Sequence, residues 1–308
     1  MQHVAASLWT RPTPPGAWEA ARLSAAAFIY RETVSRWAVV AKFYAAKTGA
    51  DAQKYAAHEH ERIQRVRSAG LGGDRTRAVE PLGVWRGVLF LEYAEGLTLE
   101  DVIAVRRSRP GTLLPALEQT ATLLARLHAR CARPAAAPDF AHPAAKALAV
   151  VETLAKHGVL EHEPVIADAL RRLVNRWAEE PRMVDFTPAL IHGDVTTTNF
   201  IFPFAGGVIA IDWERAKEAD PASDVGRLLA KTSHSIARHG GTLVEALPLL
   251  ERAVQAYCDA APPGYDGETL AGRARFYQAY STLRIARNGW LPHLTRMALA
   301  AQALALLT

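Results

Sequence analysis

The sequence has only two cysteines and lacks any long apolar segment. Cys131 and Cys258 lie far apart without the spacing of metal ligands, so we expect thiols in a reducing compartment and no disulfide. No segment approaches the length of about 18 uninterrupted apolar residues that a membrane-spanning helix needs. Residues 11–15 contain an arginine and three prolines where a secretory signal peptide would have an apolar stretch. We therefore expect a soluble, cytoplasmic protein without a membrane span.

The sequence also lacks a basic tract, although its net charge is positive. It has 36 lysines and arginines against 31 aspartates and glutamates, a net charge of +5, and the basic residues are scattered. This distribution argues against a nucleic-acid partner and suits a small anionic ligand such as a nucleotide. With 308 residues, half of them hydrophobic, the chain is long enough for two lobes with separate cores.

What the sequence does contain is a set of short apolar runs, each followed by polar residues. Residues 188–191, 199–204 and 208–211 are expected to be buried strands, and the last two are joined by a turn at 205–207. The polar residues next to these strands are expected to converge at one end of the resulting hairpin.

Three of these polar residues have the chemistry that phosphoryl transfer requires. Such a reaction needs one carboxylate to orient the attacking hydroxyl, and oxygen ligands to hold Mg²⁺ against the phosphates. Asp194 suits the first task, and Asn199 and Asp212 suit the second.

The order of these residues resembles a known pattern. The run His192-Gly193-Asp194, then Asn199, then Ile211-Asp212-Trp213-Glu214 after a hairpin resembles the catalytic and metal motifs of the aminoglycoside phosphotransferase and choline kinase family, relatives of the protein kinases. The resemblance implies an ATP- and Mg²⁺-dependent kinase that acts on a hydroxyl of a small molecule. It also implies an α+β, bilobal protein-kinase-like fold, with an antiparallel-sheet N-lobe at residues 1–95 and a mainly helical C-lobe at 96–308.

The resemblance assigns further residues to the nucleotide. Lys42, which closes an apolar strand, would pair with the α and β phosphates, and a glutamate on the next helix would pair with Lys42. Glu59 fits that spacing best, and Glu61 is the alternative. In the segment that resembles the kinase hinge, the Glu92 carbonyl and the Ala94 amide would read the adenine edge.

Other residues are expected to support the site. His192 would hold the catalytic loop through hydrogen bonds, and His128 would pack in the core. Asp224 would either brace the catalytic loop, as in the family, or cap a helix.

The elements expected elsewhere agree with this fold. Residues 18–44 have the β-branched and aromatic pattern of a strand meander, and 87–93 form a further strand. Apolar spacing of three and four predicts helices at 51–69 and 113–131, two more within 144–179, and at least three after Glu214. A helical insertion before the catalytic loop is typical of the small-molecule kinases.

Two features depart from the protein-kinase pattern. Residues 17–48 contain no glycine where a glycine-rich phosphate loop is expected, and Ser24 to Ala27 supply the only small side chains there. Thr196 stands where protein kinases usually have a lysine. The first departure leaves open how the phosphates are clamped.

Parts of the sequence also fit two other functions. The threonine-rich loop also resembles that of the small Bud-type protein kinases, but Trp213-Glu214 and the helical insertion argue against this. A nucleotide-binding regulator without turnover would more naturally have lost Asp194, Asn199, Asp212 or Lys42.

The charge of the C-terminal segment bears on the acceptor. Residues 215–308 contain 11 lysines and arginines against 8 aspartates and glutamates, which favours a neutral or anionic acceptor over a polycationic aminoglycoside. Sugars and other polyols come first, and an amino alcohol or a lipopolysaccharide-core acceptor is the alternative.

The sequence does not define the oligomeric state. Residues near one C-terminal helix would either line an acceptor pocket or pack in the core: Tyr277, Tyr280, Arg284, Arg287 and Trp290. A polycationic acceptor would need well-placed acidic groups that outweigh this average, and the candidates are Glu218, Asp220, Glu245 and Asp266.

Overall fold

The chain forms two compact units. The computed structural model describes residues 17–24, 27–35, 37–44, 51–73, 75–134, 136–261 and 267–308. Unit 1 consists of Met1–Leu97 with Phe200–Arg215, and unit 2 consists of Thr98–Asn199 with Ala216–Thr308. Residues 200–215, which the sequence assigned to the second lobe, cluster with unit 1 because their two strands pair there.

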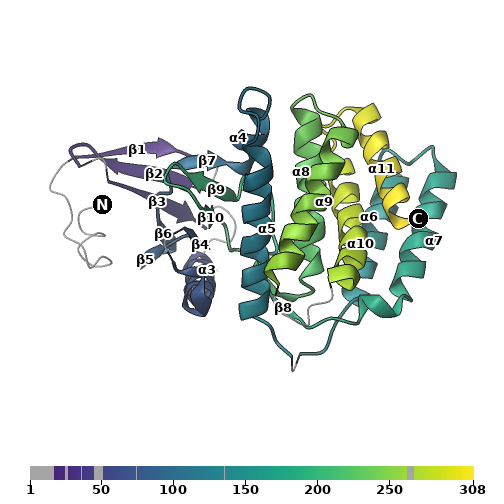
Figure 1. The fold of residues 1–308 in the computed structure, drawn as a ribbon, viewed down its shortest axis with the longest axis horizontal. Helices are drawn as coiled ribbons and strands as arrows, with labels where there is room; N and C mark the ends of the chain where they lie inside the picture. Colours follow the sequence, from purple (N-terminus) through teal and green to yellow (C-terminus); the bar gives the residue numbers. More distant parts are fainter. Residues whose placement is uncertain are drawn as a thin grey trace. The chain divides into compact units, whose positions relative to one another are not determined.

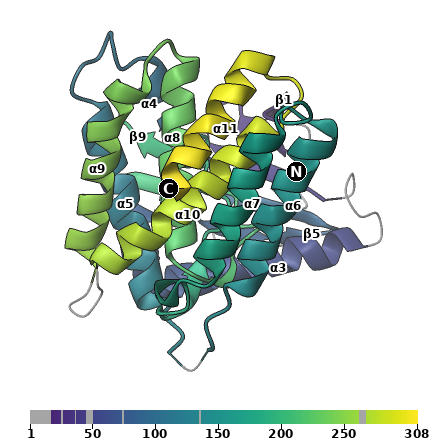
Figure 2. The same cartoon turned by 90° about the vertical axis from the view of Figure 1, so that its right-hand side faces the viewer.

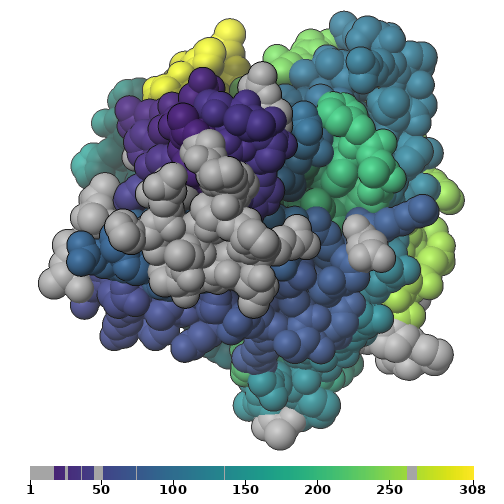
Figure 3. All heavy atoms as spheres, turned by 90° about the vertical axis from the view of Figure 1, so that its left-hand side faces the viewer, coloured from purple at the N-terminus to yellow at the C-terminus, as the bar shows by residue number. Residues whose placement is uncertain are grey.

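Unit 1 is built on an antiparallel sheet of five strands in the order β1-β2-β3-β6-β5 (Figure 1). Their bounds are β1 Trp18–Arg22, β2 Ala27–Glu32, β3 Ala38–Phe43, β5 Pro81–Trp85 and β6 Val88–Glu92. Val39 and Ala41 of β3 are fully buried in alternation, as expected for one face of a sheet turned to the core. The edge strand β1 is mostly exposed, and its atoms are visible in purple in Figure 3.

Helix α3 (Ala52–Val66) packs against β3, β5 and β6. Its buried residues Ala52, Ala56, Glu59, Ile63 and Val66 recur every three or four positions, which places them on one face. Glu59 is the charged member of this apolar stripe, so its carboxylate must find partners inside unit 1. A short π-helix, η2 (Arg67–Leu71), follows.

A second sheet combines strands from the two chain segments that make up unit 1. Its order is β4 (Thr76–Ala78), β10 (Val208–Ala210), β9 (Phe200–Pro203) and β7 (Gly96–Thr98). β9 and β10 form the expected antiparallel hairpin, and β10 also pairs in parallel with β4. This pairing fixes the segment 211–214 at the end of β10.

Unit 2 is mainly helical. Its helices are α4 (Leu99–Ala104), α5 (Leu113–Arg130), α6 (Ala141–His157), α7 (Pro164–Ala178), η3 (Pro181–Met183), α8 (Ala222–Arg238), α9 (Leu243–Ala260), α10 (Gly267–Ala286) and α11 (His293–Leu307), with a two-stranded sheet of β8 (Ala189–Ile191) and β11 (Lys217–Ala219). α8 packs against α9 and α10, while α11 lies beside α7 and α10 (Figure 2). The sheet of unit 1 and the helices of unit 2 agree with the α+β class expected from the sequence.

The close packing of α8 against α10 depends on one glycine. A Cβ atom at Gly226 would lie 2.5 Å from the carbonyl oxygen of Ala274 and 2.6 Å from the amide nitrogen of Gln278. Only a residue without a side chain permits this approach. The neighbouring Arg227 is thereby brought close to α10.

Two expectations from composition can be compared with the structure. Cys131 and Cys258 form no disulfide. Among the helices within the described ranges, none combines the length and the apolar character that crossing a membrane requires.

Candidate active site

Within unit 1, three carboxylates surround the ammonium group of Lys42. Lys42 Nζ lies 2.8 Å from Glu59 Oε2, 2.6 Å from Asp212 Oδ1 and 3.3 Å from Glu214 Oε2. Burial alone would lower the pKa of Lys42, but the charges of Glu59 and Asp212 outweigh it and raise this pKa above its ordinary value. Lys42 therefore remains a cation, held at the end of β3.

Glu59 connects three segments of unit 1. Its Oε2 accepts hydrogen bonds from Lys42 and from the Tyr44 hydroxyl, and its Oε1 accepts one from the Trp213 amide at 3.1 Å. Burial and the Glu59 charge raise the pKa of Tyr44, so this hydroxyl stays a donor. The structure thus pairs Lys42 with Glu59 and not with Glu61, which lies on the exposed face of α3.

Asp212 has an unusual backbone conformation. Its φ is +63°, in the left-handed region that residues other than glycine rarely adopt, and such conformations gather at functional sites. The fully buried Trp213 secures this turn, because its indole nitrogen donates to the Ala210 carbonyl at 3.1 Å. The Asp212 side chain remains 38% exposed, so it can reach a ligand as well as Lys42.

The acidic groups of unit 1 form a donor set suited to a hard cation. One oxygen from each of Glu59, Asp212 and Glu214 lies within 4.8 Å of the others. Carboxylate oxygens are the ligands that Mg²⁺ prefers. Because Glu59 is committed to Lys42, Tyr44 and Trp213, Asp212 and Glu214 are the members better placed to bind an ion.

In unit 2, the loop after β8 is held by a buried carboxylate. Asp224 Oδ2 accepts from the His192 amide at 2.7 Å, and Oδ1 accepts from the Gly193 amide at 2.9 Å. His128 Nε2 lies 3.2 Å from the same carboxylate. Burial would raise the pKa of Asp224, but the hydrogen bond and charge of His128 outweigh it and lower this pKa. Asp224 therefore braces the loop. The buried His128 contacts the Asp224 carboxylate, and the buried His192 binds it through its backbone amide.

This bracing sets the position of Asp194. Asn199 Nδ2 donates to the Asp194 carbonyl oxygen at 2.9 Å, which ties the two ends of the loop together. The guanidinium of Arg227 forms an ion pair with the Asp194 carboxylate and also donates to the Gly193 carbonyl at 3.1 Å. Sequence reasoning missed Arg227, although it follows Asp224 by three residues and so shares a face of α8 with it.

A partly buried glutamate, Glu100 at the start of α4, supports the same loop. Its carboxylate accepts hydrogen bonds from the Thr197 hydroxyl at 2.5 Å and the Ser235 hydroxyl at 2.7 Å, and His239 Nε2 lies 2.9 Å away. Burial favours its neutral form, but the hydrogen bonds from Thr197 and Ser235 prevail and lower the pKa of Glu100. No signal in the sequence marked this residue, because its partners are far away along the chain.

The expected hinge lies at the end of β6. The Glu92 carboxylate accepts hydrogen bonds from the guanidinium of Arg77 and from the Glu80 amide, the latter at 2.7 Å. Ala94 lies in the extended segment before β7, and its amide has no hydrogen-bond partner among the described residues. Of the small residues expected to replace a glycine loop, 25 and 26 lie outside the described residues.

A cavity of about 140 Å³ adjoins the Asp194 loop within unit 2. Its lining includes residues of that loop and of β11, α6, α8 and α10: Gly193, Lys217, Lys146, Arg227, Tyr280 and Arg284. Tyr277 also lines it but is largely buried against Phe276 and Phe140. Arg287 lines a neighbouring cavity, whereas the side chain of Trp290 is 70% exposed.

The acidic residues that the sequence offered for a polycationic acceptor are already paired where the structure describes them, although Asp220 does line this cavity. Asp220 is buried and paired with Arg273, Glu218 pairs with Arg133, and Glu245 caps α9. Residue Asp266 lies outside the described residues. Besides the buried Asp220 and Asp224, the exposed Asp139 also lines the cavity beside the Asp194 loop. Cations outnumber carboxylates in this lining, which contains Lys146, Lys217, Arg227 and Arg284.

Comparison with known proteins agrees with this arrangement. A family model described as the phosphotransferase enzyme family, APH, matches residues 21–277. No relative among the curated proteins matches the chain.

Several solved structures share the fold. An aminoglycoside phosphotransferase from Alicyclobacillus acidocaldarius has a TM-score of 0.64 at 12% identity, covering 98% of this chain and 94% of its own. A Plasmodium vivax ethanolamine kinase has 0.58 at 11%, covering 94% and 80%. The ternary complex of streptomycin, ATP and APH(2″)-IIa has 0.56 at 14%, covering 94% and 91%. These likenesses confirm the protein-kinase-like fold that the sequence predicted.

Proposed function

Because the chain belongs to the phosphotransferase enzyme family, we propose that it transfers the γ-phosphate of ATP to a hydroxyl group of a small molecule. Sugars and other polyols are the first class of acceptor, ahead of amino alcohols and aminoglycosides. The observation that carries the proposal is the position of Lys42 between the carboxylates of Glu59 and Asp212. A lysine held in this way offers a fixed positive charge to phosphate oxygens.

On the nucleotide side, Lys42 would contact the α and β phosphates, while the Glu92 carbonyl and the Ala94 amide would bind the adenine edge. The ATP complex of a relative with this fold supports a nucleotide substrate. Asp212, by its exposed carboxylate, and Asn199, by its place in the motif, would hold Mg²⁺. When bound there, Mg²⁺ would supply positive charge against the charge that develops on the phosphate oxygens during transfer.

On the acceptor side, Asp194 would orient the hydroxyl and receive its proton. The acceptor oxygen forms a bond to the γ-phosphorus as the bond to the β,γ-bridging oxygen breaks, and ADP leaves with that oxygen. Arg227 keeps the Asp194 carboxylate in one orientation, so the acceptor meets a base that is already aligned.

The test is an ADP-release screen against sugars, polyols, amino alcohols and aminoglycosides, with product detection by mass spectrometry. We expect phosphorylated product from at least one class, and a loss of about 100-fold or more in kcat for Asp194→Ala with ATP binding retained. Asp168→Ala is the matched control, because Asp168 is exposed on α7 and pairs only with Arg171. Normal turnover by Asp194→Ala would contradict the assignment.

A further inference from the structure

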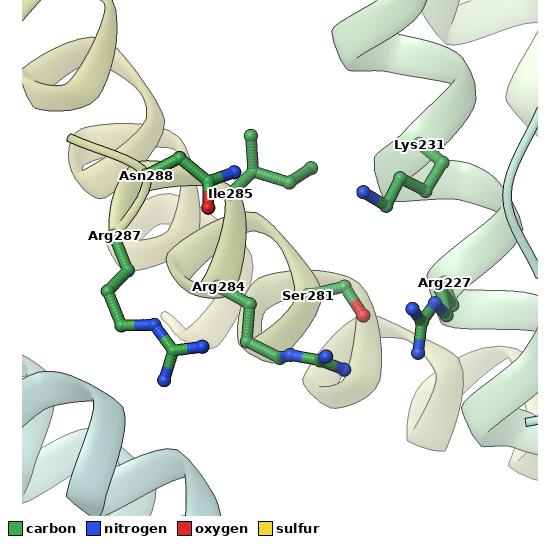
Figure 4. A pocket seen from close by; sticks show the side chains of 7 residues that line it. All are labelled: Arg227, Lys231, Ser281, Arg284, Ile285, Arg287 and Asn288. Atoms are coloured by element: carbon green, nitrogen blue, oxygen red, sulfur yellow. The ribbon is translucent and has the colours of Figure 1, made fainter. Parts of the chain in front are cut away.

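A second cavity in unit 2, of about 120 Å³, is lined by basic side chains (Figure 4). Arg227 and Lys231 reach it from α8, Ser281 and Arg284 from α10, and Arg287 and Asn288 from the segment that follows. No carboxylate lines it among the described residues. This volume holds a group much larger than one water molecule.

Apart from Arg227, which is paired with Asp194, the basic side chains of this cavity have no ion pair among the described residues. Within the described part of the chain, neither Lys231, Arg284 nor Arg287 has a carboxylate within ion-pair distance. The Arg284 guanidinium lies over the ring of Tyr280, with its central carbon 5.8 Å from the ring centroid. By contrast, Arg171, Arg252 and Arg273 all pair with carboxylates.

The pKa of Lys231 is lowered in this basic environment. Burial and the charge of Arg227 lower its pKa, although Asp194 opposes the shift, and Arg284 and Arg238 lower it further. Clustered cations that are half removed from water favour a bound anion, which supplies the missing counter-charge.

The cavity is continuous in its lining with the one beside Asp194. Arg227, Ser281 and Arg284 line both cavities, and Figure 4 shows Ser281 and Arg284 pointing towards Arg227. Because Arg227 is paired with the Asp194 carboxylate, an anion at Lys231 and Arg284 would lie within unit 2 beside the proposed base. One molecule spanning both cavities would present a hydroxyl to Asp194 and an anionic group to the basic cluster.

We propose that the acceptor carries an oxyanionic group, a phosphate or a carboxylate, which Lys231 and Arg284 bind while its hydroxyl lies at Asp194. Ser281 and Asn288 supply neutral hydrogen-bond donors, and Arg287 borders the site. The planar guanidinium of Arg284 matches the two oxygens of either anion. This proposal rests on the proposed function and narrows its acceptor class to anion-bearing polyols.

The first experiment compares acceptors that share a carbon skeleton and carry a neutral, anionic or cationic group. Glucose, glucose 6-phosphate, glucuronate and glucosamine are assayed with ATP and Mg²⁺, alongside the corresponding glycerol series of glycerol, glycerol 3-phosphate and glycerate. We expect kcat/KM for an anion-bearing member to exceed that of its neutral parent at least tenfold, and which series member leads distinguishes phosphate from carboxylate. Equal or better use of the neutral or amine-bearing members would overturn the proposal while leaving the kinase function intact.

The second experiment measures binding without turnover, so it remains decisive if no acceptor in the panel reacts. Inorganic phosphate and succinate are titrated calorimetrically into protein saturated with ADP and Mg²⁺. We expect K231Q and R284Q each to weaken binding of the preferred anion at least tenfold. R252Q is the matched control, because Arg252 is exposed on α9 and pairs with Glu118. Undiminished anion affinity in both K231Q and R284Q, or no binding to wild type, would overturn the proposal.

Discussion

The guanidinium of Arg227 forms an ion pair with the carboxylate of Asp194, and its other end donates to the carbonyl of the preceding Gly193. One side chain on α8 thus fixes both the backbone and the side chain of the proposed base. Arg227 also lines both cavities, so the residue that positions the proposed base also borders the proposed acceptor site.

Replacing Arg227 by glutamine should lower kcat by about 100-fold, since Asp194 would then sample several rotamers. The KM for ATP should change little, and Arg227→Lys should recover part of the loss because it restores the positive charge. Steady-state kinetics with ATP and acceptor varied separately measure this split. Arg252→Gln serves as the control, and a loss confined to the KM for ATP would refute the positioning role.

Replacing Asp212 by asparagine should weaken MgATP binding more than binding of metal-free ATP. Asparagine tolerates the left-handed backbone at this position, so the change removes charge with little strain. Isothermal titration with and without Mg²⁺ separates the two affinities, and we expect a loss of about tenfold for MgATP. Asp168→Asn controls for the loss of one negative charge; identical MgATP affinity in wild type and Asp212→Asn would remove Asp212 from the metal site.

Glu100 should contribute to the acid sensitivity of the fold. Its pKa is held below the ordinary value of 4.5 in the folded state. As the pH falls through 4.5 the unfolded chain binds a proton first, so the stabilisation by Glu100 shrinks and is lost once the pH passes the folded-state pKa. Above this range the contribution is fully present.

Glu100→Gln should therefore reduce the free energy of unfolding at pH 7 and flatten its dependence on pH below about pH 5. The slope should change by at most ~1.4 kcal/mol per pH unit, the value for one proton. Urea denaturation at a series of pH values provides the measurement. Glu251→Gln, at an exposed position of α9, is the control; parallel curves for wild type and Glu100→Gln would argue against this role.

Gly226→Ala should destabilise unit 2 by about 1–3 kcal/mol, because the added methyl group meets the backbone of α10 at Ala274. Thermal unfolding would show it as a lower Tm. Gly289→Ala is a suitable comparison, because a Cβ there meets no atom within 4 Å. If anion binding at Lys231 and Arg284 depends on the spacing of α8 and α10, Gly226→Ala should also weaken it.

Much of the architecture follows from patterns that are local in the sequence. The apolar runs before Asp194 and Asp212 predicted their strands. The spacing of Glu59 from Ile63 and Val66 predicted that these residues share the buried face of α3, as they do. The family resemblance and the kinase-like fold rested on such short segments, and both are confirmed.

Partners distant in the sequence could not be predicted. Arg227 meets Asp194 across 33 positions and Glu100 meets Ser235 across 135, so no periodicity connects them. The charge count of residues 215–308 indicated the character of the acceptor site only on average. It did not show that Arg273 pairs with Asp220 whereas Arg284, within the described part of the chain, pairs with no carboxylate.

The composition of unit 1 from two separate stretches of chain has a consequence for the order of folding during synthesis. Lys42 and Glu59 leave the ribosome early, but Asp212 and the strand that pairs with β4 follow only after residues 98–199 have been made. Until about half of unit 2 has emerged, β4 therefore lacks its partner strand β10, and Lys42 lacks two of its three carboxylates, those of Asp212 and Glu214. At roughly 5–20 residues per second this interval lasts several seconds, a period in which an incomplete sheet is exposed to aggregation.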